Sequence, residues 1–186
     1  MPIKTLFRYV FCAALLYMQS MMTTAFAQKN VEQKNGTHEK KTQTAGDLVR
    51  FSNPASMSQP TRYSHVAEVR GGRLVFFSGQ ISDDAKGTVV GKGDIRAQTR
   101  QVFANLKSAL ESVGADWSNI VKMNTYLTDA ANIPAFREIR EEVLANVQPR
   151  PASTAVIVSK LFGEDWLLEI EAVAVIPDKS ASKKQK

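Results

Sequence analysis

Glu169 is the residue whose surroundings in the sequence best suit acid–base chemistry. It follows Leu167 and Leu168 and precedes Ile170, and a carboxylate held among apolar side chains can act as a general acid or base. Glu171 would share its face of a strand, because side chains alternate between the two faces. The alternative interpretation is that one or both carboxylates simply face solvent.

Ser78-Gly79-Gln80 is the second candidate group. It follows an apolar run, and a glycine at the end of a strand lets a ligand approach the backbone closely. The alternative is that Gly79 only begins a loop. His65 and Ser78 could formally belong to a Ser-His-Asp triad, but no Gly-x-Ser-x-Gly turn surrounds the serine. This favours His65 as a half-buried strand residue.

The sequence contains few residues that bind metals. Its two histidines are His38 and His65, and its one cysteine is Cys12. These residues form no cluster with the spacing of a metal site. We therefore predict that the protein holds no metal ion.

Residues 1–27 have the features of a secretory signal peptide. Lys4 and Arg8 precede an uncharged, mostly apolar run, which ends in a small-x-small cleavage signature at Ala27. An uncleaved membrane anchor is the alternative, but polar residues dilute the run, and a span needs about 20 predominantly apolar residues. We predict export to the periplasm or the exterior after cleavage, without stable insertion in the membrane.

The basic charge of the chain lies in its tails. The formal net charge is +6, whereas residues 61–177 alone carry −1. Residues 28–60, rich in polar and turn-forming residues, are predicted to be a disordered or extended linker, and 178–186 form a basic C-terminal tail. A nucleic-acid-binding protein usually concentrates its positive charge on a folded patch, so we predict no nucleic-acid partner.

The domain at 61–177 is predicted to have an α+β fold with the order β-β-α-β-α-β-β. The first two strands form a hairpin around Gly71-Gly72. Apolar residues at helical spacing predict a helix from the N-cap Asp94 to about Val113, and Pro134 opens a second. The remaining strands are predicted at Ile120–Leu127, Ser153–Val158 and Leu167–Val175, and the two helices are expected to cover one face of the sheet.

Five motifs in this order resemble the Rid (YjgF) family over about residues 63–176. Leu74-Val-Phe-Phe-Ser-Gly-Gln-Ile81 is similar to the family's hairpin, and Asp94-Ile-Arg-Ala-Gln-Thr-Arg-Gln-Val-Phe-Ala-Asn-Leu-Lys107 is similar to its first helix. Three further segments resemble its last strands: Ile120–Asp129, Arg150-Pro-Ala-Ser-Thr154 and Leu168-Glu-Ile-Glu-Ala-Val-Ala-Val175.

The resemblance implies a chorismate-mutase-like fold, a homotrimer with clefts between subunits, and hydrolysis of reactive imines or enamines without a cofactor. It implies that Tyr63, Ser78 and Gly79 line the cleft and that Glu169 holds the attacking water. Backbone groups near Thr154 and Ala155 would position the substrate nitrogen and that water.

Ser153 and Ala155 depart from the family pattern. Deaminating members carry an arginine where this chain has Ser153, and Ala155 replaces a cysteine common nearby. A hydroxyl does not substitute for a guanidinium that pairs with a substrate carboxylate. Arg137 or Arg150 could supply the charge from another direction, although Arg137 could equally be a solvated helix residue.

Two functions therefore remain open at this stage. One is a Rid-type deaminase with a substrate other than the usual 2-imino acids. The other is a trimer on the same scaffold that binds a small molecule without turnover. Nuclease activity, also attributed to this family, is disfavoured by the near-neutral core and the absence of a histidine pair in the predicted domain.

Overall fold

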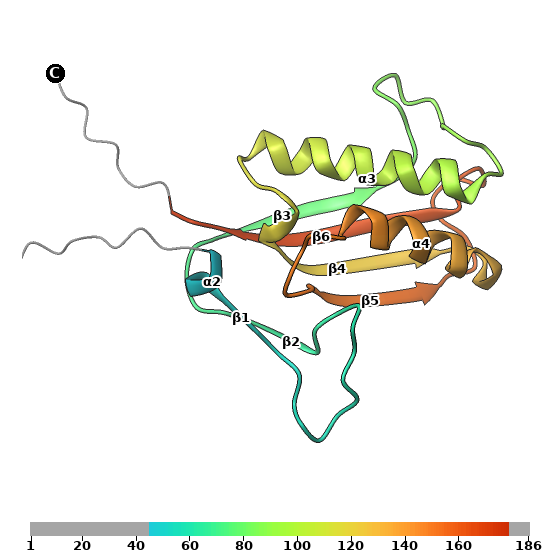
Figure 1. Ribbon diagram of the computed structural model, residues 1–186. Helices are drawn as coiled ribbons and strands as arrows, with labels where there is room; N and C mark the ends of the chain where they lie inside the picture. The colour runs from blue at the N-terminus through green and yellow to red at the C-terminus, as the bar shows by residue number, and fades with distance from the viewer. Residues whose placement is uncertain (1–44, 179–186) are drawn as a thin grey trace, which may run out of the picture. The chain divides into compact units, whose positions relative to one another are not determined.

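The computed structural model describes residues 45–178 as an α+β fold of two layers (Figure 1). The predicted signal segment, most of the predicted linker and the basic tail after residue 178 lie outside the described residues. The main sheet has the strand order β3-β6-β4-β5. Its strands are β3 (Arg73–Gln80), β4 (Ile120–Leu127), β5 (Ala152–Ile157) and β6 (Leu168–Ile176).

Both long helices lie on one face of this sheet, as predicted (Figure 1). Helix α3 (Ile95–Ser112) begins after Asp94, whose carboxylate accepts hydrogen bonds from the first-turn amides of Arg96 and Ala97. Helix α4 (Ile133–Val143) follows the short 3₁₀ turn η2 (Ala130–Asn132) and has a proline in its first turn. No helix within residues 45–178 is both long and apolar enough to cross a membrane.

The core lies between the helices and the sheet. The predicted stripe of α3 is confirmed, with Val102, Leu106 and Leu110 fully buried. They pack against alternate residues of β4 and β6, such as Met123 and Ile170. A second 3₁₀ turn, η1 (Trp117–Asn119), leads from α3 into β4. Strands β4 and β5 are parallel, so α4 serves as the crossover that such a pair requires.

The predicted N-terminal hairpin is wrong. Strand β2 (Val66–Val69) pairs with β1 (Val49–Ser52) in a separate two-stranded sheet, and β3 pairs with β6. Gly72 has a φ of +83°, and a Cβ there would lie 2.8 Å from the Ile176 carbonyl oxygen. The turn therefore sends the chain from one sheet into the other rather than folding two strands together.

The predicted linker extends too far, because its end is folded. Residues within 28–60 form the short helix α2 (Ala45–Leu48) and strand β1. Leu48 is 1% exposed, and with Val49 it packs against Val121 and Val175 of the main sheet. Two apolar residues are enough to dock this segment because they meet an apolar end of the sheet that the helices leave uncovered.

Candidate functional site

The face of the sheet opposite the helices carries the polar candidates. Along β6, Leu168 and Ile170 point into the core, while Glu169 and Glu171 point to the other face, which we call the open face. The apolar residues flanking Glu169 in the sequence therefore do not surround its carboxylate. The expectation that Glu169 lies in an apolar wall is wrong, because neighbours along a strand occupy opposite faces.

Glu169 instead lies against Gly79. A Cβ built on Gly79 would fall 1.6 Å from the Glu169 Oε1 atom, so no larger residue fits while the carboxylate stays in place. The pairing of β3 with β6 shifts register between Phe77 and Gln80, and such bulges re-aim nearby side chains. Ser78 and Gly79 occupy this bulge, so the structure brings together three of the predicted site residues.

The two carboxylates of the open face have different environments. Glu171 Oε1 accepts hydrogen bonds from Asn124 Nδ2 at 2.6 Å and from the Tyr126 hydroxyl at 3.1 Å. The bond to Glu171 raises the pKa of Tyr126 above its usual value. The Glu169 carboxylate makes no hydrogen bond or ion pair with any residue in 45–178. Of the two, it is the one free to bind water or substrate.

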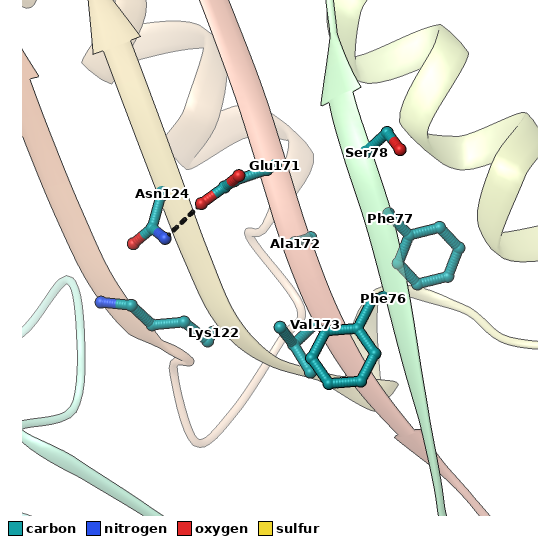
Figure 2. A pocket seen from close by; sticks show the side chains of 8 residues that line it. All are labelled: Phe76, Phe77, Ser78, Lys122, Asn124, Glu171, Ala172 and Val173. Carbon is teal, nitrogen blue, oxygen red and sulfur yellow. Dashed lines mark hydrogen bonds between the residues drawn. The ribbon is translucent and has the colours of Figure 1, made fainter.

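A pocket of about 430 Å³ lies on the open face (Figure 2). Phe76 and Ser78 line it from β3, Glu171 from β6, and Lys122 and Asn124 from β4. Lys122 also donates from Nζ to Thr154 Oγ1 at 2.5 Å. Alternation along β4 places Lys122, Asn124 and Tyr126 on this face.

A larger pocket, of about 650 Å³, lies at the outer edge of the sheet beside β5, and we call it the β5 pocket. It contains all five of the remaining predicted site residues, which come from the segment before β2, from α4 and from β5: Tyr63, Arg137, Ser153, Thr154 and Ala155. Gln59, Pro60, Thr61, Arg62, Phe136, Arg140 and Glu141 complete its wall.

Three arginines give the β5 pocket a positive charge. Arg137 is exposed and makes no hydrogen bond or ion pair with the described residues. Arg140 is only 5% exposed, and its Nη1 donates to the Arg62 carbonyl at 3.1 Å and to Glu141 Oε1 at 3.0 Å. Burial lowers the pKa of Arg140 from its usual value. Neither Arg62 nor Arg140 was identified from the sequence.

Arg150 does not serve as the substitute cation that the sequence allowed. It is 9% exposed, its Nη2 donates to Glu141 Oε2 at 2.9 Å, and its Nη1 donates to the Leu144 carbonyl. It does not line the β5 pocket. Its role here is to hold the loop before β5 against α4.

Within one chain, the predicted site residues fall into two separate groups. Ser153 pairs with Met123 and so faces the helices, whereas Glu169 lies opposite Tyr126 on the open face. Strands β3 and β5 form opposite edges of the sheet, about 14 Å apart at the usual strand spacing. Within one chain, neither of these two pockets contains Ser78 together with Ser153.

Within residues 45–178, no three His, Cys, Asp or Glu side chains are close enough together to hold a metal ion. The polar groups that line the two pockets are an amine, amides, hydroxyls, guanidinium groups and the carboxylates of Glu171 and Glu141, which accept hydrogen bonds from separate sets of residues. The chemistry that they suit is hydrogen bonding and proton transfer to a polar ligand.

Comparison with known proteins gives a consistent family. The family model described as Endoribonuclease L-PSP matches residues 54–176. A RutC family protein of Pyrococcus horikoshii is 39% identical over 57% of this chain and 82% of its own length. A protein of Dermatophagoides farinae named 2-iminobutanoate/2-iminopropanoate deaminase is 31% identical over 68% of this chain and 94% of its own.

The solved structures agree. A protein of unknown function from Yersinia pestis, assigned to the conserved Rid family, is 34% identical and superposes with a TM-score of 0.64 over 69% of this chain and 99% of its own. The YjgF gene product of E. coli is 33% identical, with a TM-score of 0.51 over 57% of this chain and 84% of its own.

Proposed function

The chain belongs to the Endoribonuclease L-PSP family, also called the YjgF/RutC/Rid family, and from that premise we propose that it is a hydrolytic imine deaminase. Its site would form between neighbouring subunits of a homotrimer. The observation that carries this proposal is the unpartnered Glu169 carboxylate lying against Gly79, which leaves one acid–base group free at a bulge.

The proposed assembly joins the two groups of site residues. Glu169, Ser78 and Gly79 of one copy would face Tyr63, Ser153, Thr154 and Ala155 of the next. Beyond its first residue, β5 has no neighbour on its outer side among the described residues. Its backbone amides and carbonyls there are open to a ligand or to another chain.

The reaction needs only water and a base. A water oxygen adds to the imine carbon while Glu169 accepts one proton of that water and passes it to the imine nitrogen, which gives a carbinolamine. The hydroxyl proton of the carbinolamine then moves by way of Glu169 to the amino nitrogen, which leaves as ammonia. The carbon keeps the oxygen as a carbonyl group, and no electron acceptor is needed. A positioned carboxylate contributes about 10²- to 10⁴-fold to such a proton transfer. The similarity to the deaminase of Dermatophagoides farinae supports this reaction class.

A trimer that binds a small molecule without turnover is the second candidate. Ser153 favours this second candidate. The resemblance to the family implies that deaminating members have an arginine at this position, which pairs with the substrate carboxylate. Because the predicted signal peptide would direct export, either function would operate outside the cytoplasm.

Ammonia release from the purified chain tests the proposal. 2-Iminopropionate and larger imines would be generated in the assay by an amino acid oxidase. We expect Glu169→Gln to lose at least about 100-fold in rate, while the matched control Glu171→Gln keeps most of it, since Glu171 is held by Asn124 and Tyr126.

One outcome would overturn the role of Glu169, and another would reject the enzyme. Equal rates of ammonia release in wild type and Glu169→Gln would mean that Glu169 is not the general base. Absence of ammonia release with every imine, including in Ser153→Arg, would favour the binding trimer if small acids still raise the melting temperature. Activity in Ser153→Arg alone would indicate an intact hydrolytic cleft with altered specificity.

A further inference from the structure

The β5 pocket has more positive charge than a small monocarboxylate requires. Its wall contains Arg62, Arg137 and Arg140 against a single acidic residue, Glu141. Both Glu141 oxygens are already used, Oε1 by Arg140 and Oε2 by Arg150. The three arginines and one glutamate of the pocket wall therefore have a formal net charge of +2.

Arg140 also has hydrogen-bonding capacity that the protein leaves unused. Its Nη2 is buried and has no hydrogen-bond partner, although the residue lines the pocket. Buried polar groups in proteins are nearly always paired, and a guanidinium offers five donors. Arg140 therefore lies in the pocket wall as a nearly buried cation, and Glu141 is the acidic side chain that pairs with it.

The β5 pocket of the single subunit is open enough to admit a small molecule. Its volume is about 650 Å³, within the usual range for small-molecule sites. Ser153 lies in the wall that β5 contributes, and its short side chain leaves open the space that an arginine would fill. Arg137 reaches the same pocket from α4 and has no partner of its own among the described residues.

We propose that the β5 pocket binds a substrate with two carboxylates, a 2-imino dicarboxylic acid, through Arg137 and Arg140. This proposal rests on the deaminase function above and names its substrate class. One carboxylate pairs with the exposed fork of Arg137, and the other lies in the positive field of Arg140. Hydrolysis then converts the C=N group to C=O and releases ammonia, giving a 2-keto dicarboxylic acid.

Binding of stable keto acids tests the inference without any turnover. Oxaloacetate and 2-oxoglutarate have the charge of the proposed products, and pyruvate is the monoacid control. Calorimetry should give a dissociation constant for either diacid at least about tenfold lower than for pyruvate. Arg137→Ala should remove most of that preference, since a bidentate arginine–carboxylate pair is lost. The control Arg100→Ala, an exposed helix arginine outside the pocket, should keep it.

The results separate this inference from the proposed function. Diacid preference that depends on Arg137, without ammonia release from any imine, would support the subsite and reject the enzyme. Ammonia release at equal rates from mono- and diacid imines, unchanged in Arg137→Ala, would support the enzyme and overturn the subsite. Sedimentation of Arg137→Ala covers the remaining possibility: loss of the trimer would mean that Arg137 pairs with a second copy, which also overturns it.

Discussion

Phe76 and Phe77 are consecutive residues of the same type, yet they occupy opposite environments. Phe77 is 9% exposed and packs in the core beneath the helices, whereas Phe76 is 74% exposed on the open face. Exposed Leu74, Val156 and Ile157 lie on strands β3 and β5 of the same sheet. The sheet thus has one face whose apolar side chains are covered within the subunit, which we call complete, and one face on which apolar side chains remain exposed, which we call incomplete.

The difference separates groups that already have partners from groups that do not. The core of the covered face consists of apolar side chains that pack against one another, and these contribute mainly stability. The open face and the β5 edge contain the unpartnered groups: an apolar ring, the Glu169 carboxylate and the Arg137 guanidinium. Residues that find no partner within the chain are the ones available to a ligand or to another copy.

The largest effect that the comparison predicts is on stability. Phe77→Ala should lower the free energy of unfolding by about 3–5 kcal/mol, because it removes a buried aromatic side chain and leaves a cavity. Urea denaturation at a fixed subunit concentration would measure this. A loss of the same size in Phe76→Ala, with assembly unchanged, would contradict the division into a complete and an incomplete face.

The next effect is on activity. Gly79→Ala should lower kcat by roughly 100-fold, since the added methyl group would occupy the position of the Glu169 carboxylate and a displacement of about 1 Å can have that consequence. The backbone at Gly79 does not require a glycine, because its φ is not positive. The melting temperature of Gly79→Ala should therefore stay near that of wild type. Full activity in this variant would mean that Glu169 takes no part in the reaction.

Assembly should show a smaller effect. Phe76→Ala should weaken association of subunits by at least about tenfold, because an interface that buries the ring gains about 1.5–3 kcal/mol from it. Analytical ultracentrifugation over a dilution series would measure the shift, and circular dichroism should show an unchanged subunit fold. Identical association in wild type and variant would mean that the open face is not an interface.

The sequence predicts elements well where the pattern is local. Strand β4 occupies the predicted residues, and its buried positions Met123, Thr125 and Leu127 alternate as expected. The Gly71-Gly72 turn was misread because a hairpin signal contains no information on distant partners. Val49 and Ile176, far from the turn in the chain, decide which strands pair with β2 and β3.

The site was harder to predict for the same reason. Eight site residues were predicted from the sequence, and the fold brings five of them into one pocket and three to one bulge. Arg140 was missed although helical spacing places it beside Phe136 and Ile139 on the buried side of α4. Arg150 could be excluded only once its bonds to Glu141 and Leu144 were known, because no local pattern encodes that contact.

The smallest predicted effect concerns titration on the open face. The Glu171 carboxylate accepts the Tyr126 hydroxyl bond and raises the pKa of that tyrosine. A raised folded-state pKa means that the contribution of this bond to stability is present below the ordinary value of about 10 and is lost as the pH rises above it. In Glu171→Gln the midpoint of Tyr126, followed by NMR of its ring, should fall back toward that value, while stability at neutral pH changes little because the group is at the surface. An unchanged titration midpoint of Tyr126 would mean that the Glu171–Tyr126 hydrogen bond is absent in solution. Glu171 and Glu169 would then not differ in their hydrogen bonding as the structure shows.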